Sequence, residues 1–239
     1  MVDYDLLSRE LAALAAGLGP ESDLHEGLHQ LSLTATEAMD LGGAGVTLQI
    51  PGAPTSYLAA ADQRTLYVER KQDQLQQGAC IDAIEASQFV AVDDLTVDAP
   101  WPEFTPVVLE AGFRAIAGVP ITFQGLNIGA VNLYSVGTRM WTTQDRHAGH
   151  LIANMAAGYL INHELLRTAQ TLAAQLQHAL DSRVIIEQAK GILAERHKVR
   201  PDDAFEAIRA FARRNRLKIH ELATQIVTGA IDIPQPTSR

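Results

Sequence analysis

Basic side chains recur at helical spacing near the carboxyl end of the chain. Arg209, Arg213 and Arg216 follow one another at i, i+4 and i+7, so one face of a helix would carry all three. Arg183 and Lys190 are spaced i and i+7 and share a face of an earlier helix. Arrays of guanidinium and ammonium groups neutralise phosphates, which predicts a polyanionic ligand. A solvated helix face is the alternative for any one such run.

The distribution of charge along the chain supports a polyanion-binding segment. Residues 181–239 contain 11 Lys and Arg residues against 8 Asp and Glu residues, a net charge of +3. Residues 1–180 carry −12, and the whole chain of 239 residues carries −9. A basic tail on an acidic body is typical of a polyanion-binding module joined to a separate domain.

Three amphipathic helices are predicted to position these basic residues. Apolar residues recur at helical spacing over residues 181–197, from Ala204 to Ala212, and over residues 218–228. Pro201 suits the first position of the second helix, and Gly229 suits the end of the third. A bundle of about fifty residues buries little surface, so it needs a neighbouring element for support.

The sequence Arg183-Val-Ile-Ile-Glu-Gln-Ala-Lys-Gly-Ile-Leu193 resembles the ANTAR domain, as do Asp203–Arg209 and Glu221–Val227. This resemblance implies an RNA-binding module of transcription antitermination regulators over residues 183–229. Such a three-helix bundle, as a dimer, would bind paired RNA hairpin loops in a leader transcript and prevent terminator formation. The family motif and the basic spacing together give the expected RNA-binding residues, which are Arg183, Ala189, Lys190, Gly191, Arg209, Arg213, Asn215 and Arg216.

Two positions in this segment depart from simple expectations. Gly191 lies inside a helix, where Gly costs about 1 kcal/mol relative to Ala, which indicates close approach of another helix or of a nucleic-acid backbone. Arg200 precedes Pro201 where a Ser, Thr or Asp cap is expected. Residues 230–239 are predicted to form a disordered tail.

A helical connector over residues 151–182 is predicted to dimerise. Apolar residues recur there in alternating steps of four and three, as in the seam of a coiled coil, and Asn162 at a seam position would fix the register. A parallel homodimer is therefore expected, although the same stripe has the alternative of packing on the chain's own sheet. The expected dimerisation residues are Leu151, Met155, Asn162, Leu165, Leu172 and Leu176.

The first two thirds of the chain predict an α+β domain. Helices are expected over residues 3–18, 23–40 and 64–76 and from Thr143 onward, and strands over residues 46–50, 57–60 and 88–92. A hairpin is expected where residues 115–122 and 126–135 flank Phe123-Gln-Gly125. Because helices precede and follow the strands, the predicted fold is an antiparallel sheet with flanking helices on one face.

This domain resembles a GAF domain over residues 22–166, preceded by an N-terminal helix in residues 1–21. The resemblance is carried by Gln76–Ala83, Ile116–Ile121 and Ile128–Leu133. It implies a sensor with a pocket for a small molecule or another signal, although GAF domains bind very different ligands and some bind none. No cofactor is evident, so the ligand is expected to be an unidentified small-molecule effector.

An irregular, aromatic-containing region suggests where such a pocket would lie. Aromatic side chains beside an irregular loop suit an apolar pocket with a polar rim, and core packing is the alternative at each position. The candidates are Cys80, Trp101, Phe104 and Phe113.

Several kinds of site find no pattern in this sequence. The acids between Asp93 and Glu103 lack calcium-loop spacing, and His147 and His150 form an i, i+3 pair without further ligands, so no metal site is predicted. Neither a phosphate-binding Gly loop with Lys nor a nucleophile elbow is found, so no catalytic residue is predicted and the protein is not expected to be an enzyme. The lone Cys80 excludes an internal disulfide.

The sequence predicts a cytoplasmic protein with no membrane partner, because no apolar run approaches 18 residues and the first residues are acidic. The predicted function is a signal-responsive RNA-binding antitermination regulator. A helix-turn-helix-like DNA-binding regulator is one alternative. The absence of Lys and Arg from the segment Ile219–Val227 counts against it, because this segment would then lack a basic recognition helix. A non-catalytic protein–protein signalling adaptor is the other.

Overall fold

The computed structural model describes residues 1–19, 22–49 and 56–234 and divides into two compact units, Met1–Leu166 and Arg167–Arg239. Helix α6 (Thr143–His197) is one continuous helix that contributes residues to both units. The strand position predicted at Ile50 lies outside the described residues.

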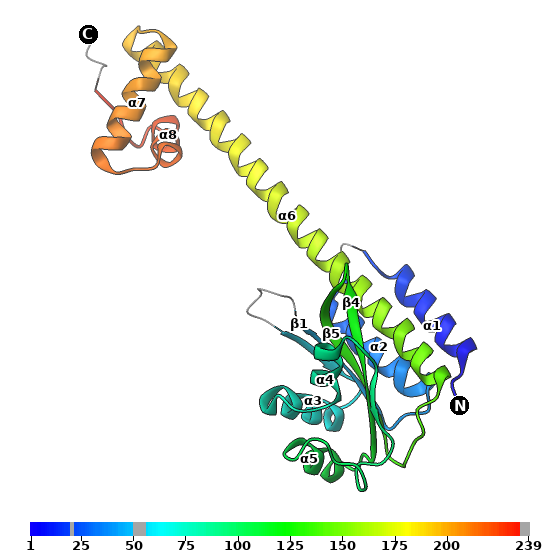
Figure 1. Ribbon diagram of the computed structural model, residues 1–239. Helices are drawn as coiled ribbons and strands as arrows, with labels where there is room; N and C mark the ends of the chain where they lie inside the picture. The colour runs from blue at the N-terminus through cyan, green and yellow to red at the C-terminus, as the bar shows by residue number, and fades with distance from the viewer. Residues whose placement is uncertain (20–21, 50–55, 235–239) are drawn as a thin grey trace. The chain divides into compact units, whose positions relative to one another are not determined.

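Five strands within the described residues form one antiparallel sheet in the order β2-β1-β5-β4-β3, which confirms the predicted sheet (Figure 1). The central hairpin turns at Gln124-Gly125, where both residues have positive φ (49° and 80°), as a two-residue hairpin loop requires. Phe123 still pairs with Leu126, so the turn is one residue shorter than predicted. The strands are β1 (Gly43–Gln49), β2 (Ser56–Ala60), β3 (Val90–Val92), β4 (Ala115–Phe123) and β5 (Leu126–Ser135).

One face of the sheet is covered by α1 (Tyr4–Ala16), α2 (Leu24–Ala38) and the first part of α6 (Figure 1). The Asp3 and Asp23 side chains accept hydrogen bonds from the first turns of α1 and α2, which is why these helices begin there. Tyr159 on α6 donates a hydrogen bond from its hydroxyl to the Leu14 carbonyl. A Cβ atom at Gly27 would overlap the Tyr159 ring, so this Gly lets α2 and α6 pack closely.

The other face carries α3 (Gln63–Leu75), α4 (Ala79–Ala86) and α5 (Phe104–Glu110). The prediction of helices on one face is therefore wrong. Helix α3, predicted as a helix, packs on this second face, and α4 and α5 are too short to show clear periodicity in the sequence. The start of α4 packs directly on the sheet, where a Cβ atom at Gly118 would overlap the Ala79 carbonyl. This second core contains Val68, Phe104, Ile116 and other buried apolar residues.

A buried ion pair fixes the beginning of α6. The Arg139 guanidinium lies 2.6 Å from the Asp145 carboxylate and also donates to the carbonyls of Met39 and Asp40. Asp145 accepts hydrogen bonds from the backbone and hydroxyl of Thr142, which caps the helix. Burial raises the pKa of Asp145, but the hydrogen bonds from Arg139 and Thr142 outweigh it and hold that pKa below its usual value.

The second unit is a helical bundle in which α7 (Pro201–Asn215) and α8 (Ile219–Val227) pack on the last part of α6. Leu193, Ile208, Leu222 and Ile226 form its centre. Arg200 makes no side-chain cap, as its residue type predicts, and Pro201 occupies the start of α7.

Residues after α8 also pack on this bundle. Ile233 is buried, Asp232 pairs with Arg196 at 2.7 Å, and the Ile233 carbonyl lies 3.2 Å from a ring nitrogen of His197. The prediction of a disordered tail from residue 230 is therefore wrong for residues 230–234, because two isoleucines there complete the apolar core. Residues 235–239 are outside the described part of the chain.

Candidate nucleic-acid interface and sensor site

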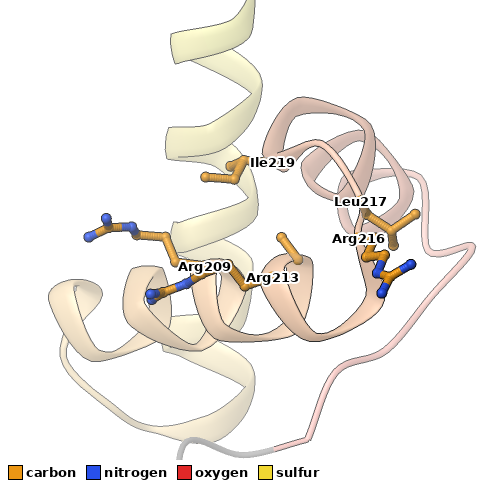
Figure 2. Close-up of a pocket in the computed structure, with 6 residues that line it drawn as sticks. Arg209, Arg213, Arg216, Leu217 and Ile219 are labelled. Atoms are coloured by element: carbon orange, nitrogen blue, oxygen red, sulfur yellow. The ribbon is translucent and has the colours of Figure 1, made fainter.

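A basic groove of about 440 Å³ lies on the second unit, at the end of α7 and the start of α8 (Figure 2). The i, i+4, i+7 spacing brings Arg209, Arg213 and Arg216 to its walls, and no acidic side chain is among the lining residues. The apolar floor is formed by Ala212, Leu217 and Ile219. Guanidinium groups bind carboxylate and phosphate anions, so a groove lined by three arginines suits an anionic ligand such as a phosphate backbone.

Arg216 holds an unusual backbone conformation at the rim of this groove. Its φ of 55° and ψ of 36° lie in the left-handed region, which side chains other than Gly, Asn and Asp rarely adopt. This conformation ends α7, because the Arg216 N–H bonds back to the last turn of the helix. The chain can then turn into α8, with Leu217 packed against the bundle.

The three arginines differ in their partners. Arg209 pairs with Glu206 at 3.0 Å in an exposed i, i+3 contact, and its guanidinium lies over the Phe205 ring. Within the described residues, no carboxylate lies in ion-pair range of Arg213 or Arg216. These two side chains therefore carry positive charge at the groove that no neighbouring carboxylate balances. The Arg216 guanidinium is directed away from those of Arg209 and Arg213 (Figure 2).

The predicted RNA-binding residues on α6 fall into three environments. Arg183 is exposed, whereas Lys190 is mostly covered and pairs with Glu187 at 3.0 Å. Ala189 is wholly buried in the bundle core, so its prediction as an RNA contact is wrong, because its methyl group packs α6 within the bundle. Gly191 is exposed, and no atom lies within 4 Å of the Cβ it lacks.

Two explanations were considered for Gly191, close approach of another helix and close approach of a nucleic-acid backbone. No helix of the described chain approaches this position, so intramolecular packing does not account for the glycine. Asn215, also exposed, donates its amide to the Phe211 carbonyl at 2.9 Å and does not line the groove.

All four predicted pocket residues of the first unit are buried, and Trp101, Phe104 and Phe113 belong to the second core, as the packing alternative predicts. Trp101 and Phe104 meet edge to face with ring centres 6.2 Å apart, and the Trp101 ring N–H donates to Asp82. Phe113 packs against the Tyr134 ring at 4.9 Å. Burial raises the pKa of the Cys80 thiol well above its usual range, so this residue stays a thiol and lacks the reactivity of a thiolate.

Beside Cys80 lies a buried polar cluster that the sequence analysis missed. The carboxylate of Glu69 on α3 is 1% exposed and accepts hydrogen bonds from three neutral donors. Asn132 Nδ2 donates to Oε2 at 2.9 Å, Thr47 Oγ1 donates to Oε2 at 3.2 Å, and the Tyr134 hydroxyl donates to Oε1 at 3.0 Å. We call Glu69, Thr47, Asn132 and Tyr134 the Glu69 cluster.

Burial raises the pKa of Glu69 from 4.5 to about 7, although the three hydrogen bonds act in the opposite direction. A Cβ atom at Gly45 would overlap the Glu69 carboxylate, so this Gly makes room for the cluster on β1. The sequence signal that could have found it is Asn132, a polar residue near the end of the otherwise apolar run Ile128–Leu133.

The predicted dimerisation residues divide along α6. Met155 and Asn162 are half-buried and Met155 packs on the first core, whereas Leu151 and Leu165 are exposed. Nδ2 of Asn162 is buried without a hydrogen-bond partner among the described residues. Further along, a set of apolar side chains is more than half exposed, namely Leu165, Leu172, Leu176, Leu180 and Val184.

Other kinds of site were sought in the described residues. No group of three or more His, Cys, Asp and Glu side chains there is arranged to hold a metal ion. The described helices include none that combines the length and the apolar character needed to cross a membrane.

Comparison with known proteins identifies both units. A model of the GAF domain family matches residues 23–160, more than half of the chain, and a model of the ANTAR domain matches residues 174–227. No curated protein matches the sequence. The GAF domain of a phosphoenolpyruvate-protein phosphotransferase from Acinetobacter is similar in fold, with 11% identity, a TM-score of 0.52, and coverage of 68% of this chain and 94% of that one.

The corresponding GAF domain from Coxiella burnetii has 15% identity and a TM-score of 0.51, with 69% of this chain and 98% of that chain covered. At these identities the two structures show the fold alone, an antiparallel sheet with flanking helices. The family models add the second domain to that fold. The chain therefore belongs to the GAF domain family and is a GAF and ANTAR domain-containing regulator, with a sensor-type domain followed by an ANTAR domain.

Proposed function

We propose that this protein is a signal-responsive, non-catalytic regulator that binds RNA hairpins in a leader transcript and prevents terminator formation in the cytoplasm. The observation that carries the proposal is the groove lined by Arg209, Arg213 and Arg216 without an acidic side chain. Each guanidinium that meets a phosphate releases counterions, so three of them give a large, salt-dependent contribution to binding.

The exposed surface around Gly191 supplies a second contact in this proposal. A missing side chain on a helix surface lets a sugar-phosphate backbone come closer than any other residue would allow. Arg183, exposed on the same helix, and Lys190 supply donors for phosphates or for unpaired bases in a hairpin loop. Loop bases are read by stacking and hydrogen bonds, so we assign discrimination between hairpins to α6 and general affinity to the groove.

A second copy of this chain is the proposed partner of the exposed stripe on α6. Leu165, Leu172 and Leu176 recur at the coiled-coil spacing predicted from the sequence, and each is more than half exposed in one chain. Leu180 and Val184 extend the stripe by steps of four, which locally unwinds a coiled coil. A parallel dimer buries this stripe and presents two copies of the basic groove, as binding to paired hairpins requires.

A small-molecule effector or another signal acts on the first unit in this proposal. Because α6 is continuous, a change of packing near its start alters the dimer seam without a flexible linker to absorb it. No enzymatic turnover is proposed.

Replacing Arg213 and Arg216 with Ala tests RNA binding through the groove. We expect weaker binding of a paired-hairpin RNA and a shallower slope of log K against log salt, because each of the two grooves of the dimer loses two phosphate contacts. The expected change in slope is about 1.4 to 1.8 per chain and about 2.8 to 3.6 for the dimer. Ala has a Cβ atom as Arg does, so the substitution does not change the backbone strain of the left-handed conformation at position 216. Titration of labelled RNA at several salt concentrations measures both quantities.

Arg214→Ala is the matched control, since Arg214 lies on the same helix turn but stacks over Phe211 and does not line the groove. It should leave the salt slope unchanged. If the control and the double variant lost the same RNA affinity, the groove would not be part of the RNA-binding surface. Duplex DNA is titrated in parallel, and DNA affinity equal to hairpin affinity would favour the DNA-binding class, whereas no nucleic-acid binding at all would favour the adaptor class.

A further inference from the structure

The carboxyl of Glu69 is buried without a cation to balance its charge. Its three partners in the Glu69 cluster are an amide, a hydroxyl and a phenol, all neutral. A carboxylate in such a place is held by hydrogen bonds alone, and its ionised and protonated forms then differ little in free energy. Burial raises its pKa to about 7, so both forms are populated near neutral pH.

Burial and the three hydrogen bonds are the causes of the Glu69 pKa shift, and no charged neighbour is among them. His25 and His29 of α2 lie beside Gln63 and Leu66 of α3, in a pocket that Glu69 does not line. Strands β1 and β2 contain no charged residue, β5 contributes Tyr134, and α4 contributes the Cys80 thiol beside the carboxyl. Burial and the Glu69 charge raise the pKa values of Tyr134 and Cys80, so both stay neutral. Helix α5 carries one acid, Glu110, which is exposed.

The other charged groups of α3 and α4 do not bind the Glu69 carboxyl, and two of them have partners of their own. Arg64 donates to the Gly42 carbonyl and lies over the Phe113 ring, and Asp82 on α4 accepts from Trp101. Asp73 raises the pKa of Cys80 but is not among the causes of the Glu69 shift. Arg70, Lys71 and Glu85 make no hydrogen bond to the Glu69 carboxyl.

Asn132 can satisfy both forms of Glu69. In the ionised form its Nδ2 donates to Oε2, and its Oδ1 is buried without a partner. The protonated carboxyl gains an O–H donor at this position and needs an acceptor. Rotation of the amide by a half turn places Oδ1 there, so that Asn132 accepts from Glu69 where it donated before.

We propose that the Glu69 cluster is a proton-operated switch inside the sensor unit, in which protonation of Glu69 reverses the Asn132 amide and changes how α3 is tied to β5. This inference deepens the proposed sensor function and rests on it only for the downstream effect. The neighbours of Asn132 on β5, Val131 and Leu133, lie in the first core together with Ala148 and Ile152 of α6. A shift of β5 therefore changes the packing at the beginning of α6.

Difference infrared spectroscopy of the full-length protein between pH 5 and pH 9 tests the switch directly, because a buried carboxylic acid absorbs apart from carboxylates. We expect one buried-acid band that disappears with a midpoint near 7 and is absent in Glu69→Gln. Tyr134→Phe removes a hydrogen-bond donor to the ionised form, so it should move the midpoint to higher pH. This second variant still tests the proposal if Glu69→Gln does not fold. A band that is absent from the wild type, or that persists unchanged in Glu69→Gln, would overturn the proposal.

Two further readouts separate this proposal from the proposed function. Hydrogen exchange in α3 and β5, corrected for intrinsic rates, should differ between pH 6 and pH 8 in the wild type and not in Glu69→Gln. Exchange that changes equally in both proteins contradicts a switch at Glu69. RNA binding is measured on the same samples: RNA binding without a titrating carboxyl defeats the switch alone, and a titrating carboxyl without RNA binding defeats the proposed function alone.

Discussion

Replacing Leu172 and Leu176 with Ser should convert the protein from a dimer to a monomer of 25.9 kDa. Both side chains are more than half exposed in one chain, at 54% and 58%, and stand at adjacent seam positions of α6. Full burial of an exposed Leu contributes about 2 kcal/mol, and about half of each side chain is still to be buried, so the four side chains of a dimer contribute on the order of 4 kcal/mol. Sedimentation velocity at micromolar concentration measures the mass directly.

Gln170→Ser with Ala174→Ser is the control, because these residues lie on the opposite face of the same turns and lose similar helix propensity. The control should remain dimeric. Since paired hairpins need two copies of the groove, the Leu variant should also lose RNA affinity while each groove stays intact. A wild-type protein that sediments as a monomer, or a Leu variant that stays dimeric, would rule out this seam.

The elements with clear periodicity were predictable from the sequence. Helix α7 has an apolar stripe and starts at Pro201, and the hairpin of β4 and β5 has Gly125 in its turn, so local chemistry determines both. Helix α5 was missed because it spans two turns and contains Pro106, which is tolerated only because it lies in the first turn. Such short helices form when the sheet is there to receive Phe104 and Val108.

The sites were predictable in part, for a different physical reason. The spacing of Arg209, Arg213 and Arg216 is local to one helix, so the sequence shows their common face. Ala189 was misassigned because a motif carries core and surface positions alike, and only the packed bundle separates them. The Glu69 cluster joins residues 22 to 65 positions apart, and no pattern along the chain relates Thr47, Glu69 and Tyr134.

Arg139→Ala should lower the free energy of unfolding of the first unit by about 3 kcal/mol or more, because it leaves the buried carboxylate of Asp145 without its cation. The change also removes the donors to the Met39 and Asp40 carbonyls, which join the end of α2 to the start of α6. Trp101 and Trp141 are the two tryptophans of the chain and both lie in this unit, so their fluorescence during urea unfolding reports its stability.

Arg114→Ala is a matched control for the geometry of the pair. Arg114 donates two hydrogen bonds to the carboxylate of Asp94, where Arg139 donates one to that of Asp145, but the Arg114 side chain is about half exposed, so water replaces the lost contacts. Its loss of stability should be much smaller. If the two variants lowered the free energy of unfolding by similar amounts, burial would not be the reason why the Arg139–Asp145 pair stabilises the fold.

The pH dependence of Asp145→Asn completes this test. The folded state holds the pKa of Asp145 below its usual value, so the pair stabilises the fold above the unfolded pKa, and this stability is lost as the pH falls through the lower, folded value. Asp145→Asn removes the titrating group, so its stability difference from the wild type should shrink as the solution is acidified. Because Asn keeps the shape and can still accept from Thr142, the variant should fold. A stability difference that stays constant from neutral to acidic pH would show that Asp145 is not ionised in the folded protein, and the account of how α6 begins would have to be given up.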